Sequence, residues 1–137
     1  STLSSSSAAS DVYKRQPVVG IFMRQRDAGE SLTIVGDGEQ RRDFTHVSDV
    51  VQAVRLIIEN KEKSVNQTFN VSYGQSHALY IVADFICTHV KSGTYKVTQR
   101  DYDYPARGAL STHKIREALG YHPLTDFNKG IMDLICE

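Results

Sequence analysis

The stretch GDGEQRRDFTHVSDVV at residues 36–51 constrains the fold of this chain more than any other. Its glycines and aspartate are typical of a tight turn, and a β-branched run at 32–35 comes just before them. Residues 42–47 alternate in the direction of their side chains as a strand does, and Ser48 is a good N-cap for a helix. We therefore predict that the two strands pair as a β-hairpin and lead into a helix over 48–60.

The same kind of pattern predicts alternating helices and strands in the rest of the chain. We expect helices over 17–29, 76–90, 111–119 and from Asp126 onward, strands over 68–72 and 94–99, and a polar loop over 61–67. This order is typical of the α/β class, although the strands are few for a complete sheet.

The first sixteen residues, STLSSSSAASDVYKRQ, do not resemble the rest of the chain. They are rich in serine and alanine and lack the apolar core of a signal peptide. The part SSAASDVYKRQ resembles an in-frame translation of a sequencing-library transposase adapter; the alternative is a natural disordered tail. We expect residues 1–16 to lie outside the fold, residues 17–137 to form one region, and the true protein to begin upstream of Pro17.

Composition excludes several classes of function. Lysine plus arginine balance aspartate plus glutamate at 16 each, so no global basic field attracts nucleic acid or an anionic membrane. No apolar run is long enough to span a bilayer. Cys87 and Cys136 lie far apart, without metal-ligand spacing, and we expect reduced, mostly buried thiols in a cytoplasmic protein.

A self-sufficient nucleotide-cofactor enzyme of this class needs a strand followed by G-x-G-x-x-G and a helix, and this chain has none. Gly36 and Gly38 do not open a helix, so they are not a phosphate-binding loop.

Residues 32–54, LTIVGDGEQRRDFTHVSDVVQAV, resemble the substrate-domain signature of the NAD-dependent nucleotide-sugar epimerases and dehydratases, which are extended short-chain dehydrogenases/reductases. Further segments of similar character follow in the family's order: TFNVSYG, YPARGALSTHKIREALGYHP and DFNKGIMDLI. The resemblance covers Pro17 to Glu137.

The resemblance implies that this chain is the C-terminal, substrate-binding part of such an enzyme. The family's N-terminal Rossmann domain holds NAD, and a Tyr-x-x-x-Lys pair performs the chemistry; that pair is absent from this chain, where Tyr80 is followed by Asp84 rather than by lysine. We therefore assign no catalytic, cofactor-binding or metal-binding residue, and expect the chain alone to be inactive. Because the family often dimerises through N-terminal helices, the resemblance implies a homodimeric parent that associates through helices absent here. Without the Rossmann domain, we expect the 48–60 helix to expose an apolar stripe that promotes association.

Arg42 is the strongest candidate for binding substrate. A guanidinium binds two phosphate oxygens at once, and the family's arginine at this place contacts the substrate diphosphate. The alternative is a surface arginine paired with Asp43 or Glu39. We expect Arg41 to be solvated, and Asp43 to serve a hydrogen bond.

The family also uses an arginine from a late loop as a second clamp, which implies Arg107 or Arg100; an exposed loop arginine is the alternative. Thr33 and Val35 lie where family members contact the nucleotide base, and ordinary sheet packing is equally compatible. The implied partner is a nucleotide sugar. The leading hypothesis is a UDP-sugar 4-epimerase such as UDP-glucose 4-epimerase, with a 4,6-dehydratase or a non-catalytic nucleotide- or partner-binding module as alternatives.

Overall fold

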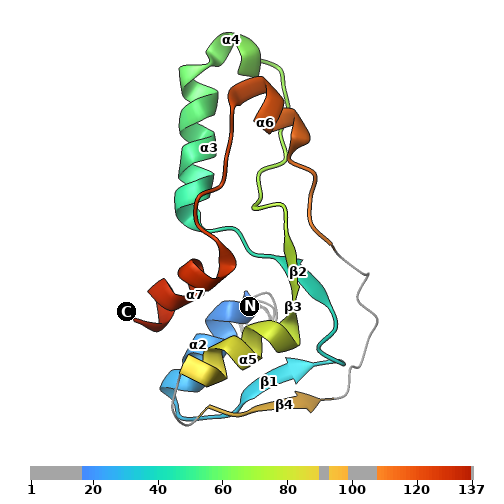
Figure 1. Ribbon diagram of the computed structural model, residues 1–137, viewed down its shortest axis with the longest axis vertical. Helices are drawn as coiled ribbons and strands as arrows, with labels where there is room; N and C mark the ends of the chain where they lie inside the picture. The colour runs from blue at the N-terminus through green and yellow to red at the C-terminus, as the bar shows by residue number, and fades with distance from the viewer. Residues whose placement is uncertain (1–16, 90–92, 99–107, 137) are drawn as a thin grey trace, which may run out of the picture.

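The computed structural model describes residues 17–89, 93–98 and 108–136, and Figure 1 shows their arrangement. Helices and strands are mixed along the chain, which confirms the α/β class. In order they are α2 (Val18–Asp27), β1 (Leu32–Val35), β2 (Arg41–Asp43), α3 (Val47–Glu59), α4 (Lys61–Ser64), β3 (Ser76–Ala78), α5 (Leu79–His89), β4 (Tyr95–Thr98), α6 (His113–Leu119) and α7 (Phe127–Ile135).

The molecule is elongated, with helices gathered at both ends (Figure 1). At one end α2, α5 and α7 lie beside β1 and β4; at the other, α3, α4 and α6 lie together, and β2 and β3 stand between the two groups. Each end has its own apolar cluster. The larger consists of Phe22, Leu32, Ile34, Leu79, Val82, Ala83, Ile86, Phe127 and Ile131. The smaller has only Ala53, Ile115, Leu119 and Tyr121 as its buried members.

The predicted β-hairpin is wrong. β1 pairs in parallel with β4, and β2 pairs antiparallel with β3, so the strands on either side of the glycine turn do not bond to each other. The turn instead serves α5: the carbonyls of Gly38 and Gln40 accept the backbone N–H groups of Tyr80 and Leu79, both at 3.1 Å. Gly38 has a φ of +81°, and a Cβ there would lie 3.2 Å from the Tyr80 Cβ, so the turn requires glycine.

Several other boundaries differ from the prediction. Residues 68–72 form no strand in the described part of the chain, because no neighbouring strand supplies a ladder; side chains bond their carbonyls instead, Lys114 at Thr68 and Tyr121 at Ser72. Ser76 does not cap a helix but opens β3, and α5 begins three residues later. β2 is shorter than expected, and the predicted loop over 61–67 contains α4.

Local signals placed other helix ends correctly. α2 starts after Pro17, and α6 ends at Gly120, whose φ of +71° is the left-handed cap that glycine favours. Asp126 caps α7, since its Oδ1 accepts the Lys129 N–H at 2.8 Å. The cap of α3 is His46 rather than Ser48, because the His46 Nδ1 accepts the Ser48 N–H.

A buried carboxylate holds α3 to the chain that follows α6. Asp49 is 1% exposed, and its two oxygens accept the N–H groups of Leu124 and Thr125 at 2.8 and 3.1 Å. One turn later the Gln52 amide bonds both the N–H and the carbonyl of His122, each at 3.0 Å. Asp49 thus does more than favour a helix N-terminus: it fixes a segment 75 residues away.

The predicted apolar stripe on α3, Val50, Val51, Val54, Ile57 and Ile58, is exposed except at Ile57, which packs partly buried against the smaller cluster. Val51 and Ile58 are 59% and 71% exposed, and Val50 and Val54 are also open to solvent. Among the described residues, no helix combines the length and apolarity that crossing a membrane requires.

The two cysteines are both unpaired thiols, and only one is partly buried. Burial, and then the charge of Asp84, raises the pKa of Cys87. The expectation of burial is wrong for Cys136, which is exposed near the end of α7.

Substituting Asp49→Ala tests the link between α3 and residues 121–125. The variant leaves two backbone N–H groups without their acceptor, so we expect the free energy of unfolding to fall by about 3 kcal/mol. Chemical denaturation followed by circular dichroism measures the change. Asp133→Ala, which removes an exposed carboxylate paired with Lys129, is the control and should change stability by less than about 0.5 kcal/mol. Equal losses in the two variants would contradict the role of Asp49.

Candidate functional site

The β2–β3 ribbon carries the principal predicted site residue. Arg42 lies on β2 opposite His77 of β3 and is partly exposed. Its Nη1 donates to the Arg41 carbonyl at 2.9 Å. No ion pair joins Arg42 to Asp43, Glu39 or any other carboxylate within the described ranges. The guanidinium therefore retains donors that an anionic ligand could use.

We expected Arg41 to be solvated, but its side chain is hydrogen-bonded to the neighbouring strand. Its Nε donates to the Ser76 Oγ at 2.9 Å and its Nη2 to the Ser76 carbonyl at 2.6 Å. The two adjacent arginines thus make different contacts. Arg41 bonds β2 to β3, so the backbone that carries Arg42 is fixed by the ladder and by the Arg41 side chain.

Asp43 joins the ribbon to the turn at residues 73–74, which confirms the expectation of a hydrogen bond. Its Oδ2 accepts the Gly74 N–H at 2.9 Å, and the Thr45 Oγ1 accepts the Tyr73 N–H at 3.1 Å. The other Asp43 oxygen is buried without a partner among the described residues.

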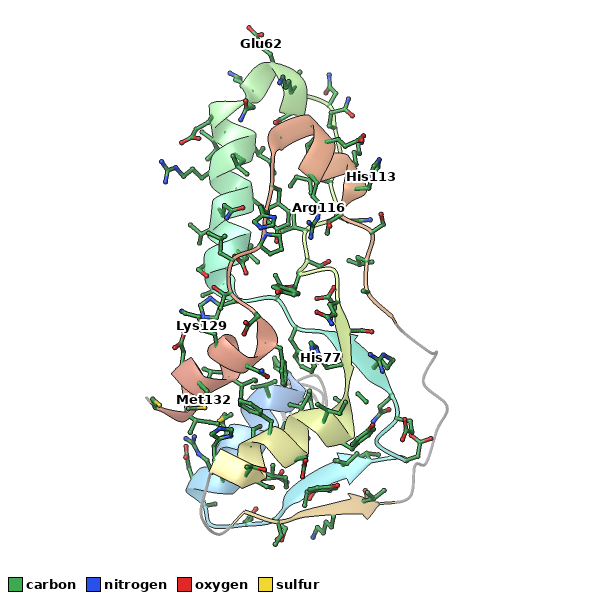
Figure 2. The ribbon with its side chains drawn as sticks, in the orientation of Figure 1. Glu62, His77, His113, Arg116, Lys129 and Met132 are labelled. Atoms are coloured by element: carbon green, nitrogen blue, oxygen red, sulfur yellow. The ribbon has the colours of Figure 1, made fainter. Side chains whose placement is uncertain are left out.

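His77 belongs to the ribbon, although no sequence signal pointed to it. Figure 2 shows it between β3 and α7, where its ring stacks on Phe127 with the centroids 4.4 Å apart. Its Nδ1 is buried and has no partner in the described part of the chain. Burial first, and then the positive charge of Arg41, lowers the pKa of His77, while Asp43 opposes the shift. A neutral imidazole here adds no charge beside Arg42.

Two clefts of about 270 Å³ each lie around Phe127. Tyr73, His77 and Asn128 line one, and Asp43, Phe44 and His46 line the other. Neither contains Arg42 or any other arginine or lysine in its lining, so neither suits a diphosphate. Arg42 is partly exposed, and neither of these two clefts includes it in its lining.

The structure separates the two residues proposed for base contact. The backbone N–H of Thr33 donates to the Gln25 Oε1 at 3.0 Å, and the Thr33 Oγ1 accepts from the Gln25 Nε2 at 3.2 Å. Thr33 therefore packs β1 against α2, as the alternative reading had it. Val35 is 43% exposed, so its side chain is open to contact. Arg100 and Arg107 lie outside the described residues.

The described residues do not fit NAD. A dinucleotide pyrophosphate needs free backbone N–H groups where a glycine loop opens a helix. Here the carbonyls of the glycine turn accept the first N–H groups of α5. Those N–H groups are therefore not free to bind an anion at the start of that helix. Within the same residues, no three His, Cys, Asp or Glu side chains gather in a way that could hold a metal ion.

Solved structures show which fold this is. An epimerase of Methanothermobacter thermautotrophicus superposes with a TM-score of 0.79 at 26% sequence identity, over 85% of this chain and 35% of its own. A UDP-glucose 4-epimerase of Thermotoga maritima, determined with UDP-glucose, superposes with a TM-score of 0.75 at 27% identity, over 84% of this chain and 37% of its own. The chain therefore has the fold of one region of the extended short-chain dehydrogenases/reductases.

Sequence comparison points to the same kind of protein. The family model described as the NAD dependent epimerase/dehydratase family matches residues 13–72, which include β1, β2 and α3. A dTDP-glucose 4,6-dehydratase of Xanthomonas campestris is 30% identical over 131 residues, covering 88% of this chain and 37% of the relative. The chain is therefore similar to the NAD-dependent epimerase/dehydratase family. It spans little more than a third of the length of that relative.

His77 should make stability depend on pH. Because its pKa is lower in the folded state than the unfolded value of about 6.5, the unfolded chain takes up the proton first as pH falls. Stability is thus retained above that value and lost as pH falls from it toward the folded pKa. We expect His77→Phe, which keeps an aromatic ring on Phe127, to flatten the loss between about pH 7 and pH 5 measured by urea denaturation.

The matched control for this pH dependence is His122→Gln, at an exposed position. It should leave the difference between the two pH values close to that of the unaltered chain. If His77→Phe kept the full pH dependence, the proposed cause would be wrong.

Proposed function

We propose that this chain binds the diphosphate of a nucleotide sugar, and that Arg42 is its principal contact. The observation that carries the proposal is the difference between the contacts of the two adjacent arginines on β2. Arg41 bonds Ser76 and holds the ribbon, while Arg42 makes no ion pair within the described ranges and is partly exposed. A diphosphate needs cationic donors with a fixed direction, and a pinned ribbon supplies them.

The remaining contacts follow from the resemblance of this region to the family. Arg107 or Arg100 supplies the second clamp on the diphosphate, and Val35 contacts the nucleotide base. Thr33 contributes little to binding, since Gln25 already bonds both of its polar groups that face α2. In this proposal residues 17–137 form the substrate-binding region and residues 1–16 lie outside it.

The proposal extends to a parent enzyme that is longer than this chain. It is an NAD-dependent nucleotide-sugar epimerase or dehydratase, with NAD bound by the N-terminal domain that such enzymes carry. The parent is cytoplasmic and binds neither nucleic acid nor membrane, as the balanced charge indicates.

Two finer assignments have separate support. The structural likeness to a UDP-glucose 4-epimerase determined with UDP-glucose favours a UDP-sugar 4-epimerase, which is the leading assignment. The 30% identity to a dTDP-glucose 4,6-dehydratase favours the dehydratase. UDP and dTDP share the diphosphate that Arg42 would bind, so Arg42 does not discriminate between them.

Calorimetric titration with UDP and UMP tests the role of Arg42. We expect the chain to bind UDP more tightly than UMP, because the second phosphate adds charge-assisted hydrogen bonds. Arg42→Gln should weaken UDP binding by about tenfold to a hundredfold and bring it close to that of UMP. A parallel titration with dTDP indicates which base the site prefers.

Arg55→Gln is the matched control, since Arg55 is exposed on α3 and pairs only with Glu59 among the described carboxylates. It removes the same charge from a different element of the fold and should leave the affinity for UDP within about twofold. Equal losses in the two variants would reduce the effect to net charge, and an unchanged affinity in Arg42→Gln would refute the assignment.

We also expect the 137-residue chain to be inactive by itself. Its sequence contains no Tyr-x-x-x-Lys; Tyr80, for example, is followed by Asp84 rather than by lysine. Incubation with NAD and UDP-glucose, or with NAD and dTDP-glucose, should give no product by chromatography and no NADH absorbance. Measurable turnover of either sugar nucleotide would contradict this expectation.

A further inference from the structure

Arg116 on α6 is a second arginine that the structure holds in place without a carboxylate. Its Nε donates to the Oγ1 of Thr112 at 2.7 Å, and Thr112 is only 6% exposed. No ion pair joins Arg116 to an acidic side chain in the part of the chain that the structure describes. The bond to Thr112 uses one donor of the guanidinium, so its two terminal nitrogens remain available to a ligand.

The guanidinium of Arg116 lies beside the turn at residues 73–74. A Cβ at Gly74 would come within 3.7 Å of the Arg116 Nη2. Gly74 also donates its N–H to the Oδ2 of Asp43, which follows Arg42 on β2. Figure 2 shows Arg116 near the segment that leads into β3. The turn thus contacts both Arg116 and the residue next to Arg42.

One cleft adjoins both arginines. Among the residues that line this cleft of about 270 Å³ are Tyr73 and Gln75, on either side of Gly74, and His77, the ladder partner of Arg42. Directly opposite residues of an antiparallel ladder carry their side chains on the same face of the sheet, with Cβ atoms about 5 Å apart. Each arginine is therefore next to a residue or a turn that borders the same cleft.

The carboxylates near this cleft do not pair with the two arginines. The Oδ2 of Asp43 accepts the backbone N–H of the turn, and the Oδ1 of Asp126 caps α7. No ion pair of the described residues joins either carboxylate to Arg42 or Arg116. An anion at the edge of the cleft therefore meets two guanidiniums that retain hydrogen-bond donors.

The ligand of the proposed function needs more than one such cation. A diphosphate in a nucleotide sugar carries about two negative charges, and one guanidinium compensates only one of them when water is excluded. Arg41 is already committed, because its Nε and Nη2 bond Ser76. Arg116 combines a held guanidinium, available terminal nitrogens and a position beside the β2–β3 ribbon.

We infer that Arg116 is a second contact for the diphosphate of the nucleotide sugar, held beside the turn at residues 73–74 while Arg42 reaches it from β2. The inference rests on the proposed function and deepens it, since it adds a cation from α6 that the resemblance to the family does not imply. Arg100 and Arg107 remain as contacts from the late loop.

The alternative is a purely structural arginine. Arg116 lies in the last turn of α6, where a cation stabilises the end of a helix. It also faces Tyr121: burial first, and then the charge of Asp49, raises the pKa of Tyr121, and Arg116 opposes that shift. A structural role predicts a loss of stability with no selective loss of diphosphate binding.

Calorimetric titration of the full chain with UDP tests the contact. Arg116→Gln should weaken UDP binding about tenfold, because the diphosphate loses charge-assisted hydrogen bonds. Arg116→Lys keeps the charge but not the planar fork, and should weaken binding about threefold. Inorganic pyrophosphate, which has neither base nor sugar, should displace UDP from the unaltered chain and bind about tenfold more weakly to Arg116→Gln.

Arg55→Gln is again the matched control, since it removes the same charge from α3 and should change both affinities by less than about twofold. If Arg42→Gln lost affinity while Arg116→Gln behaved like Arg55→Gln, this inference would fail and the proposed function would stand. If the unaltered chain did not prefer UDP to UMP, both would fail. Circular dichroism checks that each variant is folded; should Arg116→Gln unfold, an unchanged affinity of Arg116→Lys for UDP would overturn the inference.

Discussion

The buried carboxylate of Asp49 is the interaction on which half of this structure depends. The helix α3 and the segment 121–125 meet beside the smaller apolar cluster, which has four fully buried members among the described residues and further partly buried ones around them. Polar contacts add to the packing between α3 and this segment: Asp49 and Gln52 bond backbone groups of His122, Leu124 and Thr125. Next to them, burial and the Asp49 charge raise the pKa of Tyr121, whose hydroxyl donates to the Ser72 carbonyl at 2.9 Å. The phenol thus stays protonated and keeps its donor.

The β2–β3 ribbon connects the two ends and carries the candidate site. Its two strands are separated by more than thirty residues in the chain, and they are held by their ladder, by Arg41 on Ser76 and by Asp43 on Gly74. Because these side chains fix the backbone of β2, the Cα of Arg42 has a defined position even though its guanidinium is partly exposed. A rigidly supported guanidinium that makes no ion pair within the described residues is suited to bind an anion.

Several surfaces of this chain lack a neighbouring segment among the described residues, and the chain spans 37% of the length of the dehydratase it resembles. Residues 68–72 form no strand in the described part of the chain, and Val47, Val51, Val54 and Ile58 on α3 are exposed. An amphipathic helix needs a neighbour to bury its apolar side. Arg42 is partly exposed and makes no ion pair within the described residues.

The sequence by itself determined the features that depend on neighbours within a few residues. Pro17, Gly120 and Asp126 marked helix ends correctly, because caps bond groups three or four positions away, and the spacing of valines predicted the stripe on α3. The motif around Arg42 indicated the family. Tertiary structure alone decided which strands pair: β1 pairs with β4, and β2 pairs with β3. The pairing of strands depends on packing across the whole chain and not on the turn that joins two consecutive strands. It also brought His77 opposite Arg42, a contact between residues 35 positions apart that no local pattern encodes.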